Sequence, residues 1–124
     1  MNINEIGRIA HENAKAKGFY DNPPSVETRL LLIHSEVSEA CEAHRKGNFR
    51  PDTVTFDDLA PLPDDAFKDI FETCVKSTLW DEIADVIIRC CDFAAAENVN
   101  LEAHILAKMR YNATRPHKHG GKAY

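Results

Sequence analysis

Residues 31–40 read LLIHSEVSEA and decide the fold class of this chain. Ile33, Val37 and Ala40 recur at intervals of three to four residues, which places them on one face of an α-helix. Glu36 and Glu39 border this apolar face instead of standing opposite it. An uncompensated charge at the edge of a core is costly, so this position already suggests a function for the two acids.

The same helical periodicity extends over most of the chain. It predicts helices over residues 2–17, 26–46, 64–96 with a kink near 77–78, and 101–113. Asn2 with Glu5 resembles a capping box, and Ser25 and Asn100 are suited to cap the second and last helices. Residues 47–63, rich in proline, glycine and aspartate, are expected to form a loop, and the tail 116–124 to be flexible or ordered only by a ligand. The sequence therefore predicts an all-α protein, a four- to five-helix bundle in a single domain over residues 1–124.

Composition excludes several functional classes. The 124 residues carry a formal net charge of −5, which argues against binding to a nucleic acid polymer. No apolar run approaches the roughly 20 residues that span a bilayer, and the N-terminus lacks the pattern of a secretory signal, so we expect a cytoplasmic protein without membrane contact. The four cysteines lack the spacing of a zinc site and are expected to be buried free thiols.

Two pairs of acids share one spacing. Glu36 and Glu39 lie three residues apart, as do Glu82 and Asp85, so each pair occupies one helix face at the border of an apolar stripe. Either pair alone is more often a solvated helix face. Together they favour a metal site, because four adjacent carboxylates would repel one another, and Mg²⁺ or Mn²⁺ prefers oxygen ligands. A di-iron site would need a Glu-x-x-His pair on each of two helices, and no glutamate stands three residues before any of the six histidines.

The last predicted helix offers positive charge. Lys108, Asn112 and Arg115 follow a spacing that places them on one face, where they could bind a phosphate chain. On spacing alone, a solvated basic helix end is an equally good interpretation.

Several blocks of sequence together resemble a known family. Residues 31–40, 81–87 (DEIADVI) and 108–116 (KMRYNATRP) are similar to the MazG-like all-α nucleoside-triphosphate pyrophosphohydrolases. Shorter stretches at 11–14, 17–19 and 119–122 also resemble members from phages and bacteria. The resemblance covers nearly the whole chain except about residues 48–78, which would be an insertion relative to compact members.

The resemblance implies a homodimer or a dimer of dimers that cleaves a (d)NTP to its monophosphate and pyrophosphate with Mg²⁺, for which Mn²⁺ could substitute. It implies four metal ligands: Glu36, Glu39, Glu82 and Asp85. Glu36 or Glu39 would also activate the attacking water. It implies phosphate contacts from Lys108, Asn112 and Arg115. More weakly, it implies a nucleoside pocket near Asn13, Lys17 and Phe19.

Some alternatives stay open at this point. The substrate could be another nucleotide, such as phosphoribosyl-ATP or a modified nucleotide, or the protein could be a non-catalytic nucleotide-binding regulator. The 48–78 insertion could be a lid, an interface element or a specificity loop.

Overall fold

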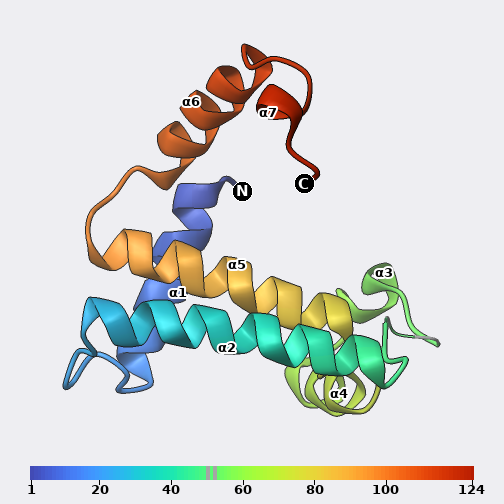
Figure 1. Ribbon diagram of the computed structural model, residues 1–124. Helices are drawn as coiled ribbons and strands as arrows, with labels where there is room; N and C mark the ends of the chain where they lie inside the picture. Colours follow the sequence, from blue (N-terminus) through green and yellow to red (C-terminus); the bar gives the residue numbers. More distant parts are fainter. Residues whose placement is uncertain (50, 52) are drawn as a thin grey trace. The chain divides into compact units, whose positions relative to one another are not determined.

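The computed structural model describes residues 1–49, 51 and 53–124, and all regular secondary structure in these residues is helical (Figure 1). The elements are α1 (Ile3–Ala16), α2 (Val26–Arg45), α3 (Phe56–Leu59), α4 (Asp64–Ile70), the π-helical η1 (Phe71–Val75), α5 (Leu79–Ala96), α6 (Leu101–Ala113) and α7 (Lys118–Gly121). The prediction of an all-α protein is confirmed.

The chain divides into two compact units. The central unit is Asn22–Cys90, and the terminal unit combines Met1–Asp21 with Cys91–Tyr124. Helix α5 therefore contributes its first part to the central unit and its last part to the terminal unit.

The predicted helix starts are confirmed in atomic detail. Asn2 and Glu5 form a reciprocal capping box, with the Glu5 amide donating to Asn2 Oδ1 at 2.9 Å. Ser25 Oγ accepts from the Thr28 amide at 3.1 Å, and Asn100 Oδ1 caps α6 in the same way. Because such caps satisfy backbone donors within one turn, a short sequence is enough to specify them.

Two expectations about the middle of the chain are wrong. The expected loop 47–63 contains helix α3, whose N-cap Thr55 and Asp58 form a second capping box. The expected single helix over 64–96 is interrupted and not merely kinked. Its first part ends at Lys76, whose ψ of 137° is extended, and Ser77 has a positive φ of 63° before α5 begins.

The C-terminal tail, expected to be flexible or ordered only by a ligand, contains the short turn α7. Its His119 and Gly120 adopt left-handed conformations, with φ of 52° and 92°. Glycine tolerates such angles without a steric cost.

Close packing joins α1 to the last part of α5 within the terminal unit. Gly7 is buried, and a Cβ atom placed on it would lie 2.7 Å from the Cys91 carbonyl oxygen. The Asn4 side chain donates a hydrogen bond to Asn100 Oδ1 at 2.8 Å and so connects α1 to the start of α6. Asp92 accepts a hydrogen bond from Tyr20 at 2.9 Å and pairs with His11 at the same distance.

In the central unit, α2 and the first part of α5 run antiparallel and side by side (Figure 1), joined by a hydrogen bond from Arg89 to Glu36. Small residues of α2, Ala40 and Ala43, are buried. Asn48 fixes the turn before α5, because its carbonyl accepts from the Leu79 amide and its side chain donates to the Ser77 carbonyl, both at 2.8 Å.

Burial differs from expectation at several apolar positions. Val37, expected on the apolar face of α2, is 42% exposed. Leu30 of the same helix and Trp80 of α5 are 51% and 62% exposed. The expectation of buried thiols is met by Cys91 and is wrong for the exposed Cys41. In the described residues, no helix is both long enough and apolar enough to cross a membrane.

The close contact at Gly7 predicts that alanine at this position destabilises the protein, whereas Gly→Ala in a helix usually stabilises it. In an exposed helix interior, Gly→Ala stabilises by about 1 kcal/mol. Here Gly7→Ala should instead lower the free energy of unfolding by about 1–3 kcal/mol, because the new methyl group overlaps the Cys91 carbonyl. Urea unfolding followed by circular dichroism measures the change. The exposed position Asn13→Ala in the same helix serves as control, and a stabilised Gly7→Ala protein would contradict the packing.

Candidate metal centre

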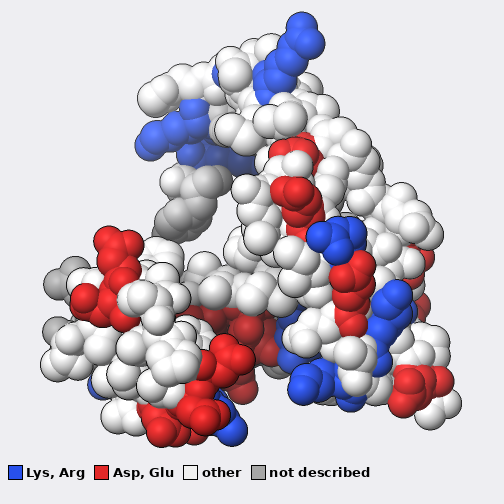
Figure 2. Space-filling view, turned by 180° about the vertical axis from the view of Figure 1, so that it is seen from behind, with Lys and Arg blue, Asp and Glu red and all other residues white. Residues whose placement is uncertain are grey.

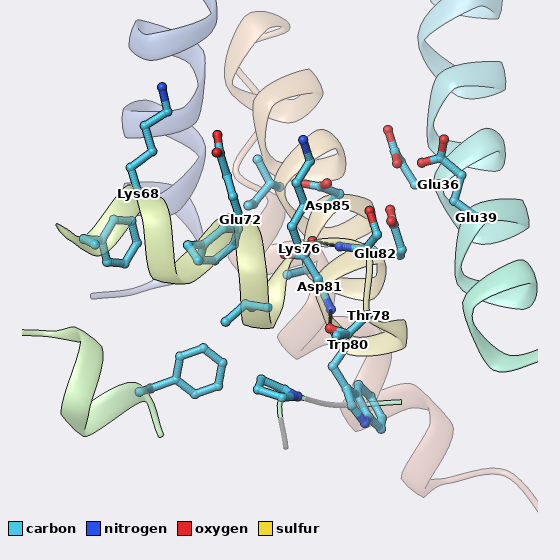
Figure 3. Close-up of a pocket in the computed structure, with 18 residues that line it drawn as sticks. Glu36, Glu39, Lys68, Glu72, Lys76, Thr78, Trp80, Asp81, Glu82 and Asp85 are labelled. Carbon is cyan, nitrogen blue, oxygen red and sulfur yellow. Dashed lines mark hydrogen bonds between the residues drawn. The ribbon is translucent and has the colours of Figure 1, made fainter. Parts of the chain in front are cut away.

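Three carboxylates from two helices converge in the central unit. Glu36 of α2 and Glu82 and Asp85 of α5 can each offer one oxygen such that all three atoms lie within 4.8 Å of one another (Figure 3). Glu36 is 6% exposed and Glu82 is 8% exposed, whereas Asp85 lies at the surface. Three of the four acids proposed from the sequence are therefore brought together.

The fourth acid, Glu39, borders this cluster from an exposed position on α2. Its pKa is raised above the ordinary value, chiefly by a hydrogen bond to Glu36 and by repulsion from the charge of that residue. Glu39 also interacts with Glu82, so it belongs to the same electrostatic group while its oxygens stay outside the three-oxygen set.

Arg89 supplies positive charge inside the cluster. Its Nε donates a hydrogen bond to Glu36 Oε1. It also lowers the pKa of Asp85, but burial and the charge of Glu36 outweigh it, so the net shift of that pKa is upward. Arg89 was not predicted from the sequence, although it follows Glu82 by seven residues and Asp85 by four and therefore shares their helix face.

The cluster is short of positive charge. Burial, followed by the charge of Glu39, raises the pKa of Glu82 from its ordinary 4.5 to about 7. The Glu82 carboxyl group is therefore substantially protonated near neutral pH unless a cation joins it. A set of oxygen donors without histidine or cysteine suits Mg²⁺ or Mn²⁺ better than zinc.

A cavity of about 930 Å³ opens beside these acids, entirely within the central unit. Figure 3 shows the residues around it, with Glu36 and Glu39 on one side and Lys68, Glu72 and Lys76 on a separate segment. Its apolar lining among the described residues includes Phe56, Phe67, Phe71, Val75, Trp80 and Ile88. The sequence analysis named none of the lining residues between 56 and 76, although Phe67, Phe71 and Val75 recur at intervals of four.

The other residues proposed from the sequence lie in the terminal unit. Lys108 and Arg115 come together over the Tyr111 ring, 5.1 Å and 5.8 Å from its centroid, and Asn112 is exposed. The three nucleoside-pocket candidates are exposed as well: Asn13, Lys17 and Phe19. None of these six lines the cavity of the central unit. Their contact with a substrate stays a prediction.

Comparisons with known protein families, curated proteins and solved structures found no match for this chain. The resemblance to MazG-like enzymes therefore rests on the sequence blocks alone.

The raised pKa of Glu82 predicts how stability depends on pH. Between about pH 4.5 and pH 7 the unfolded chain releases this proton while the folded chain keeps it. The unfolded state then binds fewer protons, so the free energy of unfolding of the metal-free protein should fall as the pH rises through this window. Glu82→Gln should flatten the decline and stabilise the protein by about 1–3 kcal/mol at pH 8.

Urea unfolding in EDTA from pH 4 to pH 8 measures the effect. Glu27→Gln, an exposed position on α2, serves as control. A decline as steep in Glu82→Gln as in the unsubstituted protein would contradict the burial of an ionisable Glu82.

Proposed function

We propose that this protein is a Mg²⁺-dependent pyrophosphohydrolase that cleaves a nucleoside triphosphate to its monophosphate and pyrophosphate. The observation that carries the proposal is the convergence of Glu36, Glu82 and Asp85 within 4.8 Å at the border of a large cavity. The resemblance of three ordered sequence blocks to MazG-like enzymes narrows the reaction from phosphate-ester or anhydride hydrolysis in general to pyrophosphate release.

The four acids would hold the metal. Mg²⁺ supplies two effects when bound to such a set, since it lowers the pKa of a bound water and neutralises charge on the leaving phosphate. Glu36, Glu82 and Asp85 are the primary ligands in this proposal because their oxygens already converge. The raised pKa of Glu82 fits this role, because a buried carboxylate without a cation is unstable.

Glu39 is the better candidate to orient and deprotonate the attacking water. Glu36, the alternative base, already accepts a hydrogen bond from Arg89 and belongs to the three-oxygen set. Glu39 lies outside that set and is exposed to solvent, so its carboxylate is free to contact a water held by the metal. No covalent nucleophile is needed, because phosphoryl transfer depends mostly on positioning and electrostatics.

The resemblance implies a second group of phosphate-binding residues at α6 and just beyond its end. Lys108 and Arg115 would bind phosphate oxygens, and Asn112 would donate a further hydrogen bond. Support comes from the proximity of both cations to the Tyr111 ring: Lys108 lies on α6, and Arg115 lies two residues beyond its end at Ala113.

We also propose that the protein works as a homodimer or a dimer of dimers. On α2, Leu30, Leu31 and Val37 are 51%, 69% and 42% exposed. Exposed apolar residues that follow one helix are typical of a surface that another chain covers.

Glu82→Gln tests the reaction. It keeps the shape of the side chain and removes the charge, so Mg²⁺-dependent pyrophosphate release should fall at least about 100-fold, since even an outer partner of a metal ligand is worth about 10- to 100-fold. Pyrophosphate release from all common NTPs and dNTPs, with products identified by mass spectrometry in ¹⁸O-labelled water, measures it.

Circular dichroism should show an unchanged helical fold in Glu82→Gln, and Glu27→Gln should keep full activity. Full activity in Glu82→Gln would overturn the assignment. Tight nucleotide binding by the unsubstituted protein without turnover in Mg²⁺ or Mn²⁺ would favour a non-catalytic regulator instead.

Leu30→Glu tests the assembly. A charge at this exposed position of α2 should convert the oligomer to a monomer, because an unpaired carboxylate would be buried in the contact. Sedimentation velocity measures the change at equal protein concentration. An unsubstituted protein that sediments as a monomer would contradict the proposed dimer.

A further inference from the structure

The wall of the cavity formed by residues 56–76 is aromatic. All three aromatic side chains of this segment line the cavity, namely Phe56, Phe67 and Phe71. Phe56 and Phe67 are 67% and 40% exposed, so a large part of their surface is left without a protein partner. The Phe67 and Phe71 rings lie 5.6 Å apart at an angle of 34°, which gives the wall two neighbouring ring surfaces. Apolar and aromatic surface around a large cavity is typical of a small-molecule site.

In the 56–76 segment the lysines face the cavity and most of the acidic side chains do not. The segment contains six acidic residues and two lysines. Both lysines, Lys68 and Lys76, line the cavity, whereas Glu72 is the one acid of the described segment that does so. Acidic side chains gather instead on the outer surface around α3 and α4, at the lower left of Figure 2. On this wall two lysines stand against one acid, which favours an anionic group here, whereas the wall formed by α2 and α5 is acidic and would need a cation.

Helical spacing produces this sorting. Phe67, Phe71 and Val75 recur every four residues along α4 and η1, and Lys68, Glu72 and Lys76 recur one position later. Figure 3 shows the side chains of Lys68, Glu72 and Lys76 pointing to the same side of their segment. The aromatic row and the charged row are therefore neighbours around the helix, about 100° apart, and both line the cavity.

The backbone around Lys76 is held in place. Its amide donates to the Phe71 carbonyl at 2.9 Å, and the following Ser77 amide donates to Asp81 Oδ2 at 2.8 Å. With the rest of the described chain, neither Lys68 nor Lys76 forms an ion pair. Both ammonium groups are thus available to a ligand in the cavity.

We infer that the 56–76 segment is the substrate-recognition wall of the site, with its phenylalanines stacking on the nucleobase and Lys76, assisted by Lys68, binding the phosphates. This inference rests on the proposed function. It favours a specificity element over a lid or an interface as the role of the insertion. It also places base recognition in the central unit, in preference to Asn13, Lys17 and Phe19.

The base and phosphate contacts can be separated with two probes. Isothermal titration calorimetry in Mg²⁺ would use α,β-imido deoxynucleoside triphosphates, which resist cleavage at the bond attacked, and inorganic tripolyphosphate, which has no base. Lys76→Met should weaken binding of both probes about 10- to 100-fold, as expected for a hydrogen bond to a charged group. Phe56→Leu should weaken the nucleotide analogue by about 10-fold or more, from lost stacking, and leave tripolyphosphate unchanged.

Matched variants outside the cavity complete the design. Lys15→Met removes an exposed lysine of α1, and Phe49→Leu an exposed phenylalanine that packs on His44. Both should bind the two probes like the unsubstituted protein. Phe19→Leu represents the rival nucleoside pocket and should also bind normally. Circular dichroism and thermal melting establish that each variant is folded.

The outcomes separate this inference from the proposed function. Turnover with normal probe binding in Lys76→Met and Phe56→Leu would overturn the recognition wall and leave the pyrophosphohydrolase intact. Weakened probe binding in these variants, with no turnover of any nucleotide by the unsubstituted protein, would support the recognition role of residues 56–76. It would also overturn the proposal that the protein is a pyrophosphohydrolase. A loss of nucleotide affinity in Phe19→Leu alone would return base recognition to the terminal unit.

Discussion

Two buried carboxylates in close proximity constrain the central unit. Glu36 and Glu82 are almost fully covered, and with Asp85 they can bring three oxygens within 4.8 Å. In a medium of low dielectric constant, neighbouring negative charges repel strongly. The fold accommodates them in part through Arg89 and in part through retention of a proton on Glu82, whose pKa is about 7. A divalent cation would relieve the same repulsion without a proton.

The start of α5 reduces the repulsion between these carboxylates. Glu82 lies in the first turn of the helix, where the positive end of the helix dipole favours a negative charge. That start is set by the sharp turn at Ser77, whose amide is fixed by Asp81. Because the helix is interrupted at residues 76–78, a new helix N-terminus lies beside the acids. The segments before and after the break both line the cavity.

Features that depend on neighbours in the sequence could be predicted, whereas features that depend on distant partners could not. The caps at Asn2, Ser25 and Asn100, and the acid pairs on α2 and α5, follow from local spacing. Arg89 shares a helix face with Glu82, but its partner Glu36 lies 53 positions earlier, so its role became visible only in the structure. The lining of the cavity by residues 56–76 likewise depends on how this segment packs, and the loop signals at 47–63 concealed the short helix within them.

The charge of the cavity would couple the binding of a metal to the binding of a substrate in the proposed function. Six carboxylates and two lysines of the described residues line it, so it carries four net negative charges when all are ionised. Two lysines cannot by themselves attract a triphosphate against that excess. In the proposed function, one divalent cation on the carboxylates would halve this excess, from four negative charges to two, and would let the metal and the lysines bind the same phosphate chain. In the proposed function, metal and nucleotide would therefore bind with positive coupling, each raising the affinity for the other by the same factor. The phenylalanines of the 56–76 segment would add affinity that does not depend on charge. In the proposed function they would select the nucleobase, while the metal would control whether the phosphates bind at all.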